Sequence, residues 1–169
     1  DGRNHYETSL SINRMSLEKI QNYLELGDRT ITGHLSLTGD LSMTGGSAAE
    51  MKQSASGIFD VRAEKGVLKK FSVLSKIFSI LNVYQLIKFQ LPDMAKDGMP
   101  YKKITFHTNL NGGVLNSKDF FIDSDAIQFS ATGNVDFIKK KLDLIVGAHP
   151  LQTLDLIAAK IPIAGWIVT

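Results

Sequence analysis

Apolar and polar side chains alternate along most of the second half of the chain. In the stretch 126–137, AIQFSATGNVDF, apolar residues fall on every second position: Ile127, Phe129 and Ala131, and then Val135 and Phe137. Strict alternation of this kind is typical of a strand with one apolar and one hydrated side. The Gly133-Asn134 pair inside the stretch indicates a turn between two such strands. The pattern therefore predicts an amphipathic antiparallel sheet.

We predict that a strand meander fills residues 99–149. The predicted strands are 101–110, Gly113–Leu115, Asp119–Asp123, Ala126–Thr132, Asn134–Ile138 and Lys141–Gly147. Asn111-Gly112 is a strong hairpin signal between the first two of them. Parallel strands need crossovers of a dozen or more residues, so segments this close together must be antiparallel.

The first third, residues 1–66, also alternates. A strand is predicted at Glu7–Ile12, and the stretch 30–46 places Leu35 and Leu37 on one parity. Glycines punctuate this stretch and leave two alternatives open: one strongly curved strand, or a hairpin that turns near Gly39-Asp40. A further alternating segment begins at Gly57.

Helical signals are fewer. Ser16 offers an N-cap for a short helix that ends near Gly27, and Ser47 with Glu50 has the spacing of a capping box. We also predict a helix over 67–92, whose apolar stripe is Leu68, Phe71, Leu74, Ile77, Phe78 and Leu81. Pro150 favours the first turn of a last short helix over 150–160.

These elements give the fold class α+β: a curved antiparallel β-sheet meander with a few packing helices, groove-like in shape. A length of 169 residues suits one domain, 1–169. The sequence starts at Asp1 without Met and ends in an apolar segment, so we expect a fragment of a longer protein. The chain has no run of 18 apolar residues that predicts a membrane span.

Composition narrows the possible functions. The net charge of +2 is too small to predict a nucleic-acid partner, and the absence of cysteine excludes disulfides and thiolate sites. The four histidines, His5, His34, His107 and His149, have no metal-ligand spacing, and we expect them at the surface. Without a nucleophile motif or a pair of catalytic carboxylates, we expect no enzyme, no metal and no cofactor.

The order of motifs in the second half resembles a known family. A segment ILNVYQL is followed by GMPY (98–101), NLNGGVL (109–115), DAIQFSATGNVD (125–136), HPL (149–151) and IPIAG (161–165). This succession, over about 67–165, resembles the C-terminal region of AsmA-like proteins of Gram-negative bacteria, relatives of the TamB type. Each motif alone is typical of strands and turns in general, so the resemblance rests on the order of the motifs.

The resemblance implies a large inner-membrane-anchored protein that projects into the periplasm, with the anchor outside this chain. It implies a β-groove that shelters phospholipid acyl chains, a role in lipid transport and outer-membrane biogenesis, and no catalytic residues. The implied partners are phospholipid acyl chains, the membrane through the parent protein, and an envelope protein.

The candidate lipid-binding residues are apolar positions of the predicted strands. They are Leu35, Leu37, Ile104, Phe106, Ile127, Phe129, Val135 and Phe137. Periodicity leaves open whether these side chains meet lipid or the predicted helices. Two hypotheses follow: a lipid-transfer module, or a structural, docking or capping domain that holds no lipid.

Overall fold

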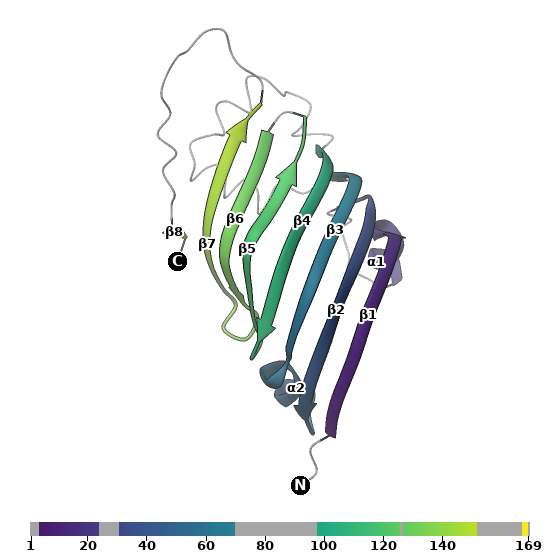
Figure 1. The fold of residues 1–169 in the computed structure, drawn as a ribbon, viewed down its shortest axis with the longest axis vertical. Helices are drawn as coiled ribbons and strands as arrows, with labels where there is room; N and C mark the ends of the chain where they lie inside the picture. Colours follow the sequence, from purple (N-terminus) through teal and green to yellow (C-terminus); the bar gives the residue numbers. More distant parts are fainter. Residues whose placement is uncertain (1–3, 24–30, 70–97, 126, 152–166, 169) are drawn as a thin grey trace.

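The computed structural model describes residues 4–23, 31–69, 98–125, 127–151 and 167–168. Its elements are β1 (Asn4–Ser16), α1 (Leu17–Tyr23), β2 (His34–Gly45), α2 (Ala48–Ser54), β3 (Ser56–Leu68), β4 (Met99–Asn111), β5 (Val114–Asp123), β6 (Ile127–Asp136), β7 (Lys141–Pro150) and β8 (Ile167–Val168). Each strand pairs antiparallel with the next one in the chain, so that a single open sheet runs from β1 to β8 (Figure 1). The predicted curved meander with a few helices is confirmed.

The two short helices begin at the predicted caps. Ser16 Oγ accepts a hydrogen bond from the backbone N–H of Lys19 at 3.2 Å, and Ser47 Oγ accepts one from Glu50 at 3.3 Å. The Glu50 carboxylate reaches back to the N–H of Gly46 at 2.8 Å, one residue before the cap. The helices lie at opposite ends of the strands, which we call the α1 end and the α2 end (Figure 1).

The strand register gives the sheet two chemically different faces. Directly paired residues of neighbouring antiparallel strands point to the same side of a sheet. One row of aligned residues near the α1 end consists of Met15, Leu35, Ala63, Ile104, Ile122, Phe129 and Ala148. We call this side the apolar face. The opposite side, the polar face, carries most of the charged side chains of the strands.

The turn predicted at Gly133-Asn134 is wrong, because β6 continues through it to Asp136. Gly133 pairs with Leu144 of β7 and has a φ of +140°. A Cβ at this position would lie 2.0 Å from the carbonyl oxygen of Asp143. Glycine is therefore needed here for the close approach of β7, rather than for a turn.

Two other strands are longer than the sequence indicates. The segments Gly113–Leu115 and Asp119–Asp123, predicted as separate strands, form one strand, β5, apart from Gly113, which precedes it. The pairing of β5 with β6 is irregular between Ser117 and Phe120. A β-bulge at this place causes the break in alternation, which in the sequence resembles a loop between two strands. Similarly, β2 continues without a turn through Gly39-Asp40. Of the two alternatives for this stretch, the single strand is therefore correct and the hairpin is not.

The predictions of helices over 67–92 and 150–160 are both wrong for their first residues, which belong to strands. Val67 and Leu68 extend β3, where they pair with Pro100 and Met99 of β4. Pro150 ends β7 as the partner of Ile127. In both places, pairing with a neighbouring strand overrides the local helical pattern. The remaining residues of these two predictions, 70–92 and 152–160, lie outside the described residues.

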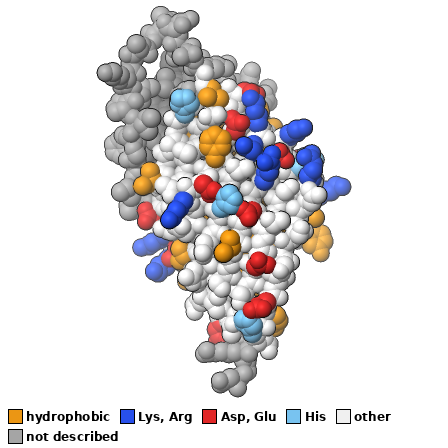
Figure 2. Space-filling view, in the orientation of Figure 1, with side chains coloured by type: hydrophobic (Ala, Val, Ile, Leu, Met, Phe, Trp, Pro, Cys, Tyr) orange, Lys and Arg blue, Asp and Glu red, His pale blue; other side chains and the backbone are white. Residues whose placement is uncertain are grey.

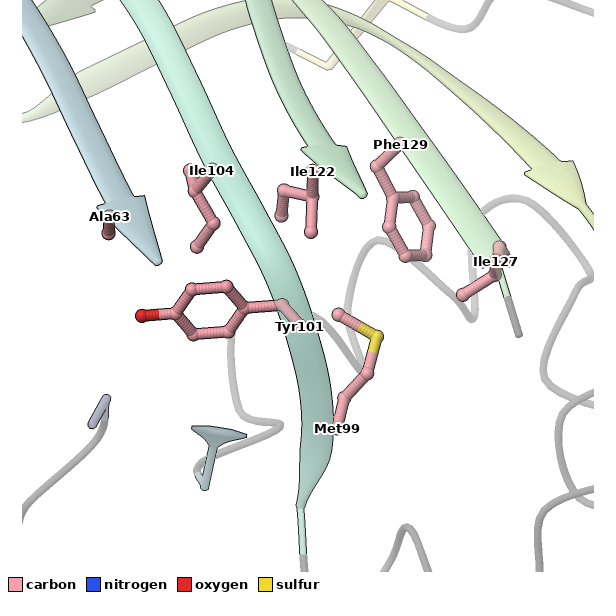
Figure 3. Close-up of a cluster of buried hydrophobic side chains, with 7 residues drawn as sticks. All are labelled: Ala63, Met99, Tyr101, Ile104, Ile122, Ile127 and Phe129. Atoms are coloured by element: carbon pink, nitrogen blue, oxygen red, sulfur yellow. The ribbon is translucent and has the colours of Figure 1, made fainter. Parts of the chain in front are cut away.

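Buried apolar side chains gather at the α1 end of the apolar face. Their cluster consists of Ala63, Met99, Tyr101, Ile104, Ile122, Ile127 and Phe129, which point toward one another (Figure 3). The Tyr101 hydroxyl donates a hydrogen bond of 2.6 Å to the carbonyl of Thr32. Burial raises the pKa of Tyr101 to about 12, so the phenol stays protonated and keeps donating. We call this cluster the closed part of the apolar face.

Candidate functional site

A second row of paired residues crosses the apolar face nearer the α2 end. It consists of Thr8, Leu41, Gly57, Leu110, Leu115, Val135 and Leu142, each paired with the next. We call it the leucine row. Seven strands at a spacing of about 4.8 Å make the row roughly 29 Å long. The row thus aligns apolar side chains of β2, β4, β5, β6 and β7, while its β1 member is Thr8 and its β3 member is Gly57.

The two parts of the apolar face differ in burial. In the closed part, Ile127 and Phe129 are only 2% and 3% exposed. In the leucine row, Leu142 is 47% exposed, and the other apolar side chains of the row are partly exposed. Tyr6, which lies outside the row and farther toward the α2 end of β1, is 45% exposed. An exposed apolar surface that continues over several strands marks a site for an apolar ligand or partner. The leucine row is therefore the candidate site.

Seven of the eight candidate residues lie on or around the apolar face, where the structure brings them together. Partly buried side chains there are Leu35, Leu37, Phe106 and Val135. Buried side chains in the closed part are Ile104, Ile127 and Phe129. Val135 alone belongs to the leucine row.

Phe137 is the exception among the candidates. The strand predicted over Asn134–Ile138 ends at Asp136, and Phe137 lies in the following turn with its side chain 59% exposed. Its backbone N–H donates to the carbonyl of Gly113 at 3.1 Å. This hydrogen bond joins the turn after β6 to the turn before β5. The Asp136 carboxylate accepts hydrogen bonds from the backbone N–H groups of Ile138 and Lys139, so the chain turns directly after β6.

Sequence reasoning did not select Leu110, Leu115 and Leu142 as candidates. The signal for Leu142 was present, because β7 alternates through Leu142, Leu144 and Val146. Leu115 was harder to find, since the β5 bulge shifts the parity between Leu115 and Phe120. Only the register shows that these leucines form a single row.

Charged side chains lie mainly on the polar face, which is turned to the viewer in Figure 2. At its centre, His107 of β4 lies between two carboxylates. His107 Nε2 is 2.7 Å from Asp60 Oδ1 of β3, and Nδ1 contacts Asp119 Oδ2 of β5. The backbone N–H of His107 also donates to Asp119 Oδ1 at 2.9 Å. The cluster therefore joins three strands across the β5 bulge.

The contacts of His107 shift two pKa values. The hydrogen bond and charge of Asp119, together with the charge of Asp60, raise the pKa of the imidazole. Desolvation opposes ionisation of Asp119, but the hydrogen bonds from the ring and backbone of His107 outweigh it and lower the pKa of this carboxyl. Since carboxylates contact both ring nitrogens, the protonated form of the imidazole is favoured, and it links β3, β4 and β5.

The described residues offer little for other kinds of site. No three His, Cys, Asp or Glu side chains among them are placed to hold a metal ion. Neither α1 nor α2, the helices of the described ranges, has the length and hydrophobicity to cross a bilayer. The four histidines lie at the surface, as expected.

The chain was compared with known proteins. A family model described as YhdP protein matches residues 1–169, the whole chain. No curated protein and no solved structure matches. The narrower resemblance to an AsmA-like C-terminal region is not confirmed and stays a prediction. Because the match covers the full length, the chain belongs to the YhdP protein family, which is related to AsmA- and TamB-type proteins of the cell envelope.

Proposed function

We propose that this chain is a non-enzymatic lipid-transfer module of the periplasm, whose apolar face shelters phospholipid acyl chains. The observation that carries the proposal is the leucine row, in which β2 and β4 to β7 align apolar side chains that are partly exposed, with Leu142 at 47%. Membership in an envelope family supports it. The parent protein would be anchored in the inner membrane and contribute to phospholipid transport toward the outer membrane.

The physical chemistry of acyl chains suits such a track. Each methylene group exposed to water costs about 0.8 kcal/mol, so a lipid tail needs apolar cover to cross an aqueous gap. Contacts between apolar groups are non-directional, and a tail can therefore slide along the row at little cost. Meanwhile the backbone hydrogen bonds of the sheet stay intact, because they lie within the sheet and not on its face.

The proposal includes no catalytic group. The polar cluster around His107 lies on the polar face, and its imidazole already contacts two carboxylates. No serine or threonine oxygen is among the contacts of this ring. We therefore assign His107 to holding the strands together.

The closed part of the apolar face favours a second candidate function. Its side chains pack against one another and leave little surface for a ligand. In this alternative, the chain is a docking or capping domain that engages an envelope protein and holds no lipid. The two functions differ in whether the leucine row contacts acyl chains.

Two residues of β7 provide a matched test. Leu142 belongs to the leucine row, whereas Ile145 faces the polar side, and both side chains are 47% exposed. We expect Leu142→Glu to lower the phospholipid bound to protein purified from bacteria severalfold, because a carboxylate beside the tails is costly. Ile145→Glu should leave the bound lipid unchanged. Native mass spectrometry of the intact chain measures the occupancy.

Circular dichroism should show that both variants remain folded, since neither side chain is buried. Equal occupancy in the two variants, or a wild-type chain that carries no phospholipid, would contradict the lipid-transfer function and favour the docking domain.

A further inference from the structure

Basic side chains are concentrated on the polar face at the α1 end. The cluster consists of Arg14, Arg62, Lys65, Lys102 and Lys103, from β1, β3 and β4. Figure 2 shows Lys and Arg gathered over the ends of β1 to β4 that lie next to α1. We call this cluster the basic end.

The basic end carries more positive charge than its acidic neighbours compensate. Glu64 lies within it, held by Arg62 at 2.7 Å and Arg14 at 3.6 Å. The hydrogen bond from Arg62 lowers the pKa of Glu64, so that this carboxylate stays ionised. Lys102 pairs with Asp125 at 2.5 Å.

Two further lysines of the cluster are available to an anion. No ion pair joins Lys65 or Lys103 to another described residue, although Asp123 lies opposite Lys103 in the sheet. Within the cluster, the five basic residues outnumber the three acidic residues beside them (Glu64, Asp123 and Asp125).

The same end exposes apolar and aromatic surface. Tyr23, the last residue of α1, is 87% exposed, the highest value among the exposed large apolar side chains of the described ranges. Met15, at the end of β1, is also exposed, and so is Lys19 on α1. Tyrosine is enriched at the membrane–water interface, where its ring lies at the level of the lipid headgroups. Basic residues at the same end of a sheet as an exposed tyrosine fit a lipid surface better than they fit an acidic protein.

We propose that the α1 end docks on a membrane surface that contains anionic phospholipid. The basic side chains contact the headgroup phosphates, and Tyr23 enters the headgroup layer. The choice of a membrane as partner rests on the proposed lipid-transfer function, because a lipid-sheltering face needs a bilayer from which to load or to which to deliver. The basic side chains are nevertheless separate from the leucine row, because they lie on the polar face at the α1 end, whereas the row lies on the apolar face nearer the α2 end.

Vesicle co-sedimentation of the 169-residue chain tests this inference. The chain should bind vesicles of phosphatidylglycerol and phosphatidylcholine, bind pure phosphatidylcholine weakly, and be released by salt. Each basic residue near an anionic surface contributes about fivefold to binding, so Lys65→Glu with Lys103→Glu should weaken it more than about tenfold. Tyr23→Ser should also weaken it, without any change in charge.

The matched control is Lys140→Glu with Lys141→Glu. These lysines lie at the α2 end, between β6 and β7, and the control changes the net charge by the same amount. The control should bind anionic vesicles nearly as well as the wild type. If the Lys65 and Lys103 double variant does not fold, Lys65→Gln replaces it, because Lys65 is exposed.

Three outcomes would overturn the docking surface. They are equal binding of the wild type to neutral and anionic vesicles, equal losses in the two double variants, and loss of bound phospholipid in the Lys65 and Lys103 variant. The last result would place the basic end in the lipid-holding site. Native mass spectrometry separates the two proposals: unchanged lipid occupancy without vesicle binding rejects the docking surface alone, and vesicle binding without bound lipid rejects the lipid-transfer function alone.

Discussion

The closed part and the leucine row lie on the same face of the same strands, yet they differ in what covers them. Ile104 and Leu110 are both apolar residues of β4, and both continue the alternation of that strand. Ile104 is 7% exposed within the cluster, whereas Leu110 is only partly buried. An apolar face alone therefore does not define a ligand site. The site is defined by the part of that face whose side chains remain exposed.

A hydrogen bond also stabilises the closed part. Tyr101 reaches across to the carbonyl of Thr32, and its hydroxyl lies where Gly33 and Gly66 leave room for it. A Cβ at either glycine would be 2.7 Å from this oxygen. Close packing of this kind makes one end of the sheet a rigid core, so that the other end can keep apolar surface for a ligand.

The largest effect should come from removing a side chain of the closed part. We expect Phe129→Ala to lower the free energy of unfolding by about 3–5 kcal/mol, because it leaves a cavity in the cluster. Leu142→Ala should cost about 1 kcal/mol or less, since this side chain is already half in water. Urea denaturation monitored by circular dichroism measures both. Similar losses in the two variants would mean that the face has one continuous core, in conflict with an open leucine row.

A smaller effect should follow from removing the Tyr101 hydroxyl alone. Tyr101→Phe keeps the ring but leaves the Thr32 carbonyl without this donor, which we expect to cost about 1 kcal/mol of unfolding free energy. The matched control is Tyr6→Phe on the exposed part of β1, which should change stability by less than about 0.5 kcal/mol. A cost at Tyr6 as large as that at Tyr101 would show that the hydroxyl does not distinguish the closed part.

The smallest effect should come from His107, which joins β3, β4 and β5 on the polar face. The pKa of His107 is raised in the folded state. Its contribution to folding stability is therefore fully present below the unfolded-state pKa of about 6.5, and it is lost as the pH rises through the folded-state pKa. His107→Gln should therefore lower the melting temperature by a few degrees in mild acid and by less in mild alkali.

The same substitution at His149, which contacts neither Asp60 nor Asp119, serves as the control for His107 and should show no such trend. Thermal melts at a series of pH values measure the difference. A destabilisation by His107→Gln that grows with pH would contradict the assignment of a cationic imidazole between two carboxylates.

Much of this architecture could be predicted from the sequence. Alternation predicted the strands, and Ser16 and Ser47 with Glu50 predicted both helix starts, because caps and strand parity depend on residues close together in the chain. Gly133 misled the prediction, since a glycine required by a neighbouring strand has the same local signature as a glycine in a turn. Val67 and Leu68 misled it in the same way, because their helical spacing says nothing about Met99 and Pro100.

The sequence by itself determined that the sheet has one apolar and one hydrated face, since side chains of a strand alternate whatever their neighbours are. Only the tertiary structure decided which apolar residues are covered. The strand register places Leu41, Leu110, Leu115 and Leu142 in one row, and packing buries Ile127 and Phe129 in the core. Burial is a property of contacts between distant segments, so a local pattern can mark a residue as apolar but cannot specify what it contacts.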